Sequence, residues 1–169
     1  MKKILLTAAL IFTALFLSAQ EKDNGNIVKT GDMVPDFKVK MFDGKETDIK
    51  ALKGKVVLIN FWATWCPSCI QELAVVQKEI IDRFAGKEFV FLPVSREDAY
   101  EKIAAFRKAR GHNFPMGMDT DRSVYSKFAK ISIPRNYVVD KTGKIVHMDI
   151  GYTPAQFKEM IEVIEKLLK

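Results

Sequence analysis

The feature that most constrains this chain is an apolar run, Val56 to Trp62, that leads directly into a pair of cysteines, Cys66 and Cys69. A run without polar and apolar alternation is typical of a parallel strand that is covered on both faces. The cysteines are therefore predicted to lie where a buried strand turns into a helix, because the apolar residues that follow them change to a spacing of three and four. These residues are Ile70, Leu73, Ala74, Val76, Ile80, Ile81 and Phe84.

The first cysteine occupies the predicted start of that helix. Pro67 follows it, and proline is favoured at the first helical position because its missing N–H would have no partner there. Cys66 should then face unpaired N–H groups and the positive end of the helix dipole, which stabilise the attacking thiolate form of cysteine. We expect Cys66 to be the nucleophile, with a pKa below the free value of about 8.5. Cys69, one turn further on, should be the more buried, resolving thiol.

Two other interpretations of the cysteine pair carry less weight. The chain has only two cysteines and two histidines. A structural disulfide between cysteines this close in sequence would close a very small loop and constrain the unfolded chain little. A zinc site would need further ligands, and His112 and His147 lie far apart without the spacing of a metal motif. The pair therefore indicates redox chemistry, and we expect no metal and no cofactor.

The N-terminus has the three parts of a secretory signal peptide. A basic start precedes an apolar stretch from Ile4 to Leu17 and a small-residue cleavage site at Ala19. The apolar stretch is short for a membrane span, which needs about 20 residues. We expect cleavage after Ala19, and the alternative is an uncleaved N-terminal segment that anchors the protein in the membrane. The chain then divides into a signal peptide (1–19), a flexible lead-in (20–30) and one domain (31–169).

Charge and compartment narrow the possible partners. The formal net charge is +6, from 27 basic and 21 acidic residues. This excess is dispersed along the chain, so we expect a solvated basic surface and no nucleic-acid partner. An exported protein with one CxxC would work outside the reducing cytosol, where disulfides persist. We expect the periplasm or another extracytoplasmic part of the envelope.

Strand and helix patterns alternate along the rest of the chain, which predicts an α/β fold with a mixed sheet. An N-terminal hairpin is expected from Asp36 to Thr47, and the last helix should begin at the capping sequence Thr153-Pro154. Between them we expect a strand at 88–94, a helix capped by Ser95 and Asp98 that ends near Arg110, a short helix at 121–130, and a hairpin at 137–149.

Around the cysteines the sequence resembles a known family. The stretch from Leu52 to Leu73, LKGKVVLINFWATWCPSCIQEL, is similar to the active-site signature of TlpA/ResA-like thiol–disulfide oxidoreductases in the thioredoxin superfamily. The likeness continues through residues 114–119, Ile133-Pro134 and 138–146, and it covers about residues 31–169. It implies a thioredoxin-like fold with helices on both sides of a mixed central sheet, an envelope location, and dithiol–disulfide exchange.

The resemblance also implies roles for residues outside the CxxC. Thioredoxin carries a buried acid in the strand before its cysteines, where this chain has Asn60. Glu72, shortly after the second cysteine, is therefore the candidate to accept the proton of the resolving thiol. Ile133 and Pro134 match the cis-proline loop beside the cysteines, and the backbone of Ile133 would pair with an extended substrate. Trp65 would either cover the thiols or receive the partner.

We therefore expect an exported thiol–disulfide oxidoreductase that reduces disulfides of envelope proteins, draws electrons from an upstream membrane dithiol donor and is a monomer. Three alternatives stay open. Pro67 directly after the first cysteine resembles the oxidase DsbA and the glutaredoxins, so a disulfide-forming oxidase is the first alternative. A redoxin-type thiol peroxidase would have threonine three residues before its cysteine, where this chain has Ala63. A copper-delivery chaperone would have a longer cysteine spacer and a histidine in the Ile133-Pro134 loop, and neither is present.

Overall fold

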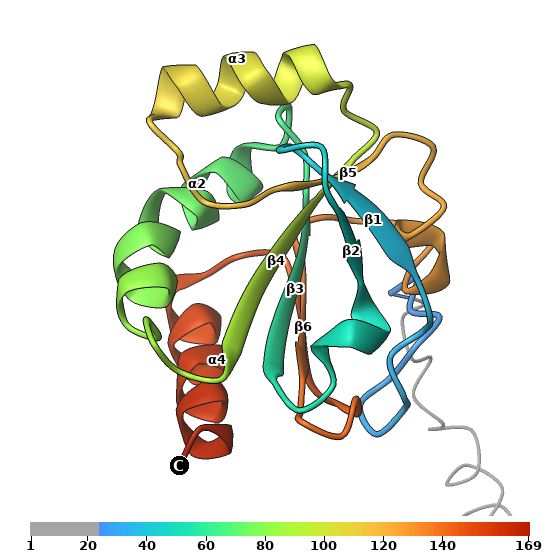
Figure 1. Cartoon of the computed structure of the whole chain (residues 1–169), viewed down its shortest axis with the longest axis vertical. Helices are drawn as coiled ribbons and strands as arrows, with labels where there is room; N and C mark the ends of the chain where they lie inside the picture. The colour runs from blue at the N-terminus through green and yellow to red at the C-terminus, as the bar shows by residue number, and fades with distance from the viewer. Residues whose placement is uncertain (1–23) are drawn as a thin grey trace, which may run out of the picture.

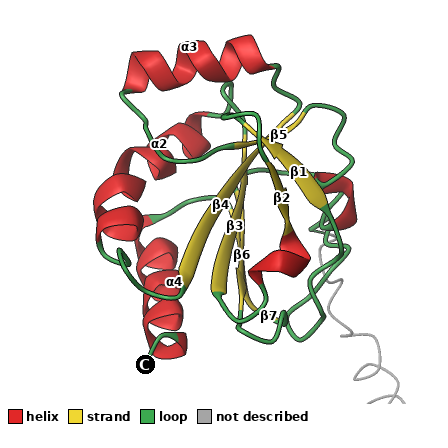
Figure 2. Ribbon diagram, viewed as in Figure 1, coloured by secondary structure: helices red, strands yellow, loops and turns green. Residues whose placement is uncertain are grey.

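The computed structural model describes residues 24–169, so the predicted signal peptide, residues 1–19, lies outside the described residues. Strands and helices alternate through the middle of this region, as Figures 1 and 2 show. In chain order the elements are β1 (Lys38–Met41), β2 (Glu46–Asp48), the 3-10 helix η1 (Ile49–Leu52), β3 (Val56–Trp62), α2 (Pro67–Val76), the π-helical turn η2 (Gln77–Asp82), β4 (Phe89–Arg96), α3 (Tyr100–Arg110), β5 (Gly117–Asp119), the 3-10 helix η3 (Tyr125–Lys127), β6 (Arg135–Val139), β7 (Ile145–Ile150) and α4 (Pro154–Leu167).

The strands of the described region form one mixed sheet in the order β2-β1-β5-β4-β3-β6-β7. Strands β3, β4 and β5 run parallel to one another, whereas β1, β2, β6 and β7 join by antiparallel pairing. β3 lies inside the sheet between β4 and β6, and all its residues are buried. The mixed-sheet α/β prediction is thus confirmed, and the apolar run is the covered strand that its composition indicates.

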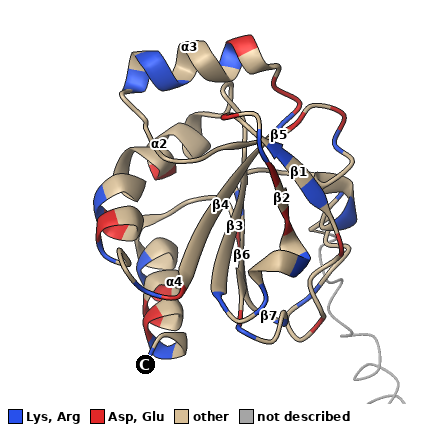
Figure 3. Cartoon of the chain, in the orientation of Figure 1, with Lys and Arg blue, Asp and Glu red and all other residues tan. Residues whose placement is uncertain are grey.

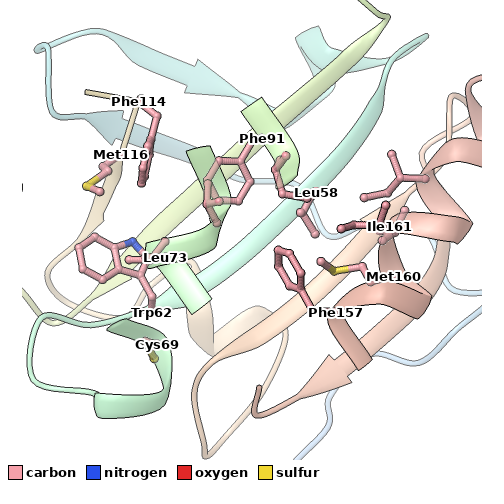
Figure 4. Packing of buried hydrophobic residues seen from close by; sticks show 14 of the residues in the cluster. Leu58, Trp62, Cys69, Leu73, Phe91, Phe114, Met116, Phe157, Met160 and Ile161 are labelled. Atoms are coloured by element: carbon pink, nitrogen blue, oxygen red, sulfur yellow. The ribbon is translucent and has the colours of Figure 1, made fainter. Parts of the chain in front are cut away.

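The sheet separates two hydrophobic clusters, and alternate residues of β3 contribute to each. Leu58 and Trp62 belong to the cluster beneath α2, α3 and α4. Ile59 and Phe61 belong to the opposite cluster, with residues of η1 and η3. Figure 1 shows α2 and α4 on one side of the sheet and the two short helices on the other. Figure 4 shows Cys69 at one end of the first cluster, near Trp62.

The predicted flexible lead-in, residues 20–30, packs on the domain over its described part. Val28 is buried in the second hydrophobic cluster. Asn26 forms an isolated antiparallel bridge with Ala129. The polar composition indicated a mobile segment, but its backbone groups pair with the loop before β6 and the side chain of Val28 is buried. The packed structure therefore begins before Gly31, the predicted start of the domain.

The helix predictions hold at α2 and α4 but not at 121–130. Only η3 forms in that range, because the carboxylate of Asp119 accepts the N–H groups of Val124 and Tyr125, at 3.0 and 2.7 Å, and holds the chain in a turn. α4 begins at the predicted capping sequence with Thr153 as its N-cap. Within residues 24–169, none of the helices has the length and apolar character that a membrane crossing requires.

Candidate active site

The two cysteines lie where β3 ends and α2 begins, and they form a disulfide. Cys66 is the N-cap of α2, and its sulfur accepts the N–H of Cys69 at 3.3 Å. Cys66 is 4% exposed and Cys69 is 0% exposed, which is the predicted order. After reduction, the helix dipole and this N–H group favour the thiolate of Cys66 over that of Cys69.

A buried carboxylate fixes the turn before Cys66. One oxygen of Asp98, Oδ2, accepts the backbone N–H of Thr64 at 2.7 Å, and Oδ1 accepts its hydroxyl at 2.8 Å. The hydroxyl of Ser95 donates to the same carboxylate at 2.7 Å. The predicted role of Ser95 and Asp98 as caps of α3 is therefore wrong: the N-cap is Ala99, which makes no side-chain hydrogen bond. Their spacing suits either role, so the sequence alone could not show that Asp98 supports the active-site turn.

The Ile133–Pro134 peptide bond is cis, as predicted, and the loop that holds it lies beside the disulfide. The carbonyl oxygen of Ile133 is 3.8 Å from the sulfur of Cys66. Pro134 is buried and leads directly into β6. The loop thus brings backbone polar groups next to the cysteine at which an exchange partner would be attached.

A buried arginine holds the same loop from the other face of the sheet. The Nε of Arg135 donates to the carbonyl oxygens of Ile131 and Ser132, at 2.9 and 3.3 Å. Its two Nη atoms donate to the side chain of Asn26 and to the carbonyl of Asn24. One guanidinium therefore ties the N-terminal segment to the cis-proline loop. This contact could not be predicted from the sequence, because an arginine after a proline carries no local signal of burial.

Glu72 is a buried carboxylate on the face of α2 that carries Cys69, and it is 1% exposed. The amide nitrogens of Asn136 and Asn60 donate to its two oxygens, at 2.6 and 3.3 Å. Burial, together with a smaller effect of the charge of Asp149, raises the pKa of Glu72 from 4.5 to about 7, against the lowering effect of these hydrogen bonds. A carboxyl with this pKa can gain or lose a proton near neutral pH.

The two asparagines reach Glu72 because they face each other across the sheet. Asn60 of β3 pairs in register with Asn136 of β6, and opposed residues project to the same face. The Nδ2 of Asn60 also donates to the Oδ1 of Asn136 at 2.9 Å. The sequence marked Asn60 as unusual within an apolar strand but did not identify Asn136, whose only signal is its position in another buried strand.

Trp65 lies on the surface beside the cysteines and is 55% exposed. The guanidinium of Arg96 lies 5.6 Å from the centre of its ring and 4.8 Å from that of Tyr125. A cation between two aromatic rings fixes their relative positions. The exposed indole therefore offers a supported apolar surface next to the disulfide. No group of three or more His, Cys, Asp or Glu side chains with metal-binding geometry occurs in residues 24–169.

Comparison with known proteins agrees with this geometry. The AhpC/TSA family matches the chain over residues 30–148. The thiol–disulfide oxidoreductase ResA of Bacillus anthracis is 29% identical over 161 residues, which cover 94% of this chain and 88% of ResA. The thioredoxin-like protein YneN of Bacillus subtilis is 31% identical over 140 residues, which cover 81% of this chain and 79% of YneN.

A solved structure supports the same assignment. A candidate protein disulfide isomerase from Bacteroides thetaiotaomicron superposes with a TM-score of 0.81 at 33% identity, and the match covers 85% of this chain and 92% of the other. The fold is therefore thioredoxin-like, with the Cys66–Cys69 disulfide at the N-terminus of α2. The chain belongs to the AhpC/TSA family within the thioredoxin superfamily and is a ResA-like thiol–disulfide oxidoreductase.

Proposed function

We propose that this enzyme is exported and reduces disulfides of cell-envelope proteins, with electrons supplied by a membrane dithiol donor. The observation that carries the direction of transfer is the buried carboxyl of Glu72 on the helix face of Cys69. A base for Cys69 speeds its attack on a mixed disulfide at Cys66. That step completes a reduction. In an oxidase the second thiol of the substrate must attack the mixed disulfide. A fast attack by Cys69 would instead release the substrate thiol in its reduced form.

The proposed reaction has two exchange steps. In the first, the thiolate of Cys66 attacks a substrate disulfide, a mixed disulfide forms, and one substrate thiolate leaves. In the second, Glu72 accepts the proton of Cys69, and the resulting thiolate attacks the sulfur of Cys66. The bond between Cys66 and the substrate breaks, the second substrate thiolate leaves, and the Cys66–Cys69 disulfide forms. Two electrons pass from the enzyme dithiol to the substrate, and the donor returns them.

The cis-proline loop and the exposed tryptophan support a binding site for an extended polypeptide. The carbonyl of Ile133 lies 3.8 Å from the sulfur of Cys66, so a chain attached to that sulfur could pair with this backbone as an added strand. Trp65 would contact apolar side chains of the same substrate. Pro134 would limit access of metals to the thiols. Figure 3 shows basic and acidic residues interspersed along the chain, which favours no partner of a single charge.

Export rests on the basic, apolar and small-residue parts of the first 19 residues. The mature N-terminus should be Gln20 or lie within a few residues of it. N-terminal sequencing of the protein isolated from cells tests this directly. Recovery of intact Met1 from a membrane-integral form would replace cleavage by the anchored alternative.

The role of Glu72 is tested on the resolving step alone. The reduced enzyme is mixed with a disulfide-containing peptide, the reaction is stopped by rapid alkylation, and the decay of the mixed disulfide is followed from pH 5 to pH 9. Glu72→Gln should slow this decay and change its pH dependence. The matched control is Glu101→Gln, because Glu101 is exposed on α3. Equal decay in both variants at every pH would remove Glu72 from the reaction.

Direction and substrate need two further measurements. The reduction potential of the Cys66–Cys69 pair, measured against glutathione, separates a reductase from an oxidase, because 30 mV corresponds to about 1.4 kcal/mol. A potential in the strongly oxidising range of DsbA would contradict the proposed direction. Cys69→Ala should trap mixed disulfides in cells, and mass spectrometry of the trapped species would identify the substrates.

A further inference from the structure

A histidine–aspartate pair lies on the edge strand β7. The Nε2 of His147 is 2.7 Å from the Oδ2 of Asp149, and their side chains are only 21% and 13% exposed. In the sequence, His147 has no metal-ligand spacing. In the structure it is paired with Asp149, whose negative charge raises the pKa of Glu72.

The register of the sheet connects this pair to the proton acceptor. Asp149 of β7 lies opposite Asn136 of β6, which in turn lies opposite Asn60 of β3. Residues opposed in this way project to the same face of a sheet. The three side chains therefore form a row across three strands, and Glu72 lies over the row and accepts a hydrogen bond from each asparagine.

We propose that His147 and Asp149 are a positioning pair that tunes Glu72. When His147 is protonated, Glu72 faces an ion pair with no net charge. When His147 is neutral, Glu72 faces the uncompensated negative charge of Asp149. The charge on His147 thereby sets the pH range in which Glu72 takes the proton of Cys69. This inference rests on the proposed role of Glu72 in the resolving step.

The groups that surround Glu72 make it sensitive to such a change. On the strand side, two neutral amides donate to it, and Asp149 is the charge that raises its pKa. Beside α4, Tyr152 has its pKa raised by burial and by the charge of Glu72. No lysine or arginine forms an ion pair with Glu72 within the described part of the chain. A change in net charge at β7 is therefore poorly compensated at this carboxyl.

The groups around His147 favour its protonated form. The hydrogen bond to Asp149 raises the pKa of His147 above 6.5 despite partial burial, and the charges of Asp149 and of Glu159 on α4 add to this effect. The pKa of Glu72 is about 7. Because both groups interact with Asp149, the protonation of each affects that of the other.

The test measures the coupling in the oxidised protein, where no thiol titrates. The pH midpoints of the Glu72 carboxyl and the His147 ring are followed by carbon-13 and proton NMR. In His147→Gln, an amide can still donate to Asp149 but the positive charge is lost, so the Glu72 midpoint should rise by ~0.5 pH units or more. Asp149→Asn should lower it. His112→Gln, which changes the other histidine of the chain, should leave it in place.

Measuring the His147 midpoint in Glu72→Gln distinguishes electrostatic coupling from a local structural change caused by the His147 substitution. Coupling between two sites is mutual, so Glu72→Gln should lower the midpoint of His147. Equal Glu72 midpoints in His147→Gln, Asp149→Asn and His112→Gln would overturn the inference, whether or not Glu72 takes part in catalysis. The last measurement follows the rate of mixed-disulfide decay against pH. In His147→Gln the pH midpoint of this rate should rise together with the NMR midpoint of Glu72. If the midpoint moves but the decay profile does not, the pair does not tune proton transfer from Cys69, and the proposed role of Glu72 fails separately.

Discussion

Replacing Glu72 by glutamine should abolish a loss of stability that the oxidised wild-type protein shows as the pH rises, because an amide does not ionise. In the unfolded chain this carboxyl has an ordinary pKa of 4.5, whereas in the folded protein burial raises it to about 7. Between these two values the folded state binds a proton that the unfolded state has released. The free energy of unfolding therefore falls as the pH rises through this range, and the loss persists above it.

The size of the effect follows from the same two values. One pH unit of difference corresponds to about 1.4 kcal/mol, so ionised Glu72 costs the fold about 3 kcal/mol above pH 7 relative to its protonated form. Below about pH 4.5 the carboxyl is protonated in both states and contributes no pH dependence. Glutamine has the shape of the protonated acid and does not ionise. Relative to wild type, Glu72→Gln should therefore gain about 2 to 3 kcal/mol between pH 5 and pH 8.

The assay is urea unfolding of the oxidised wild type and variant at pH 5, 6, 7 and 8, followed by circular dichroism. Oxidised protein is used because the disulfide removes thiol titration from both states. The quantity of interest is the difference in unfolding free energy between variant and wild type, which cancels the pH dependence of groups that do not interact with Glu72. Glu101→Gln, on the exposed face of α3, is the control and should give a flat difference. A flat difference for Glu72→Gln as well would show that this carboxyl ionises freely in the fold.

Three further changes test other parts of the site. Cys66→Ser should abolish disulfide exchange, whereas Cys69→Ser should still attack once and accumulate mixed disulfide, as gel shifts after alkylation would show; faster alkylation of Cys69 than of Cys66 would reverse their roles. Asp98→Asn should cost about 1 to 3 kcal/mol, because its amide nitrogen would face donors that now meet a carboxylate, and thermal unfolding would measure this. Pro134→Thr should slow product release and increase stable mixed disulfides, and a loss of folding without such species would contradict its role at the sulfurs.

The parts of the site that the sequence predicts are those set by local pattern. The apolar run predicts β3, the change to a spacing of three and four predicts α2, and Pro67 predicts that Cys66 is the N-cap of α2. The cis bond before Pro134 is different, because the trans form of such a bond is favoured by only about 0.5 to 1 kcal/mol and surrounding structure decides the outcome. It could be predicted only through the resemblance to a family.

The parts that the sequence does not predict are polar contacts between distant positions. Asp98 binds Thr64 across 34 positions, and Asn136 binds Glu72 across 64. Each partner has an ordinary surface role when considered alone, since serine, threonine and aspartate are common caps and asparagine is common in turns. Only the pairing of the strands brings them together. The same holds for the His147–Asp149 pair, because β7 must lie beside β6 before Asp149 can act on Glu72.

The predicted instability at high pH also bears on why a carboxyl lies at this position. An apolar side chain next to Leu73 would fill the same space in the first cluster without an ionisation cost. The two asparagines lower the pKa of Glu72 but do not offset its burial, so they keep the carboxyl within reach of neutral pH without making it a permanent anion. A stable core alone does not need this balance, whereas a base for Cys69 does, because it must be ionised before proton transfer and protonated after it. The lower stability above pH 7 and the capacity to accept a proton there are therefore consequences of the same buried ionisation.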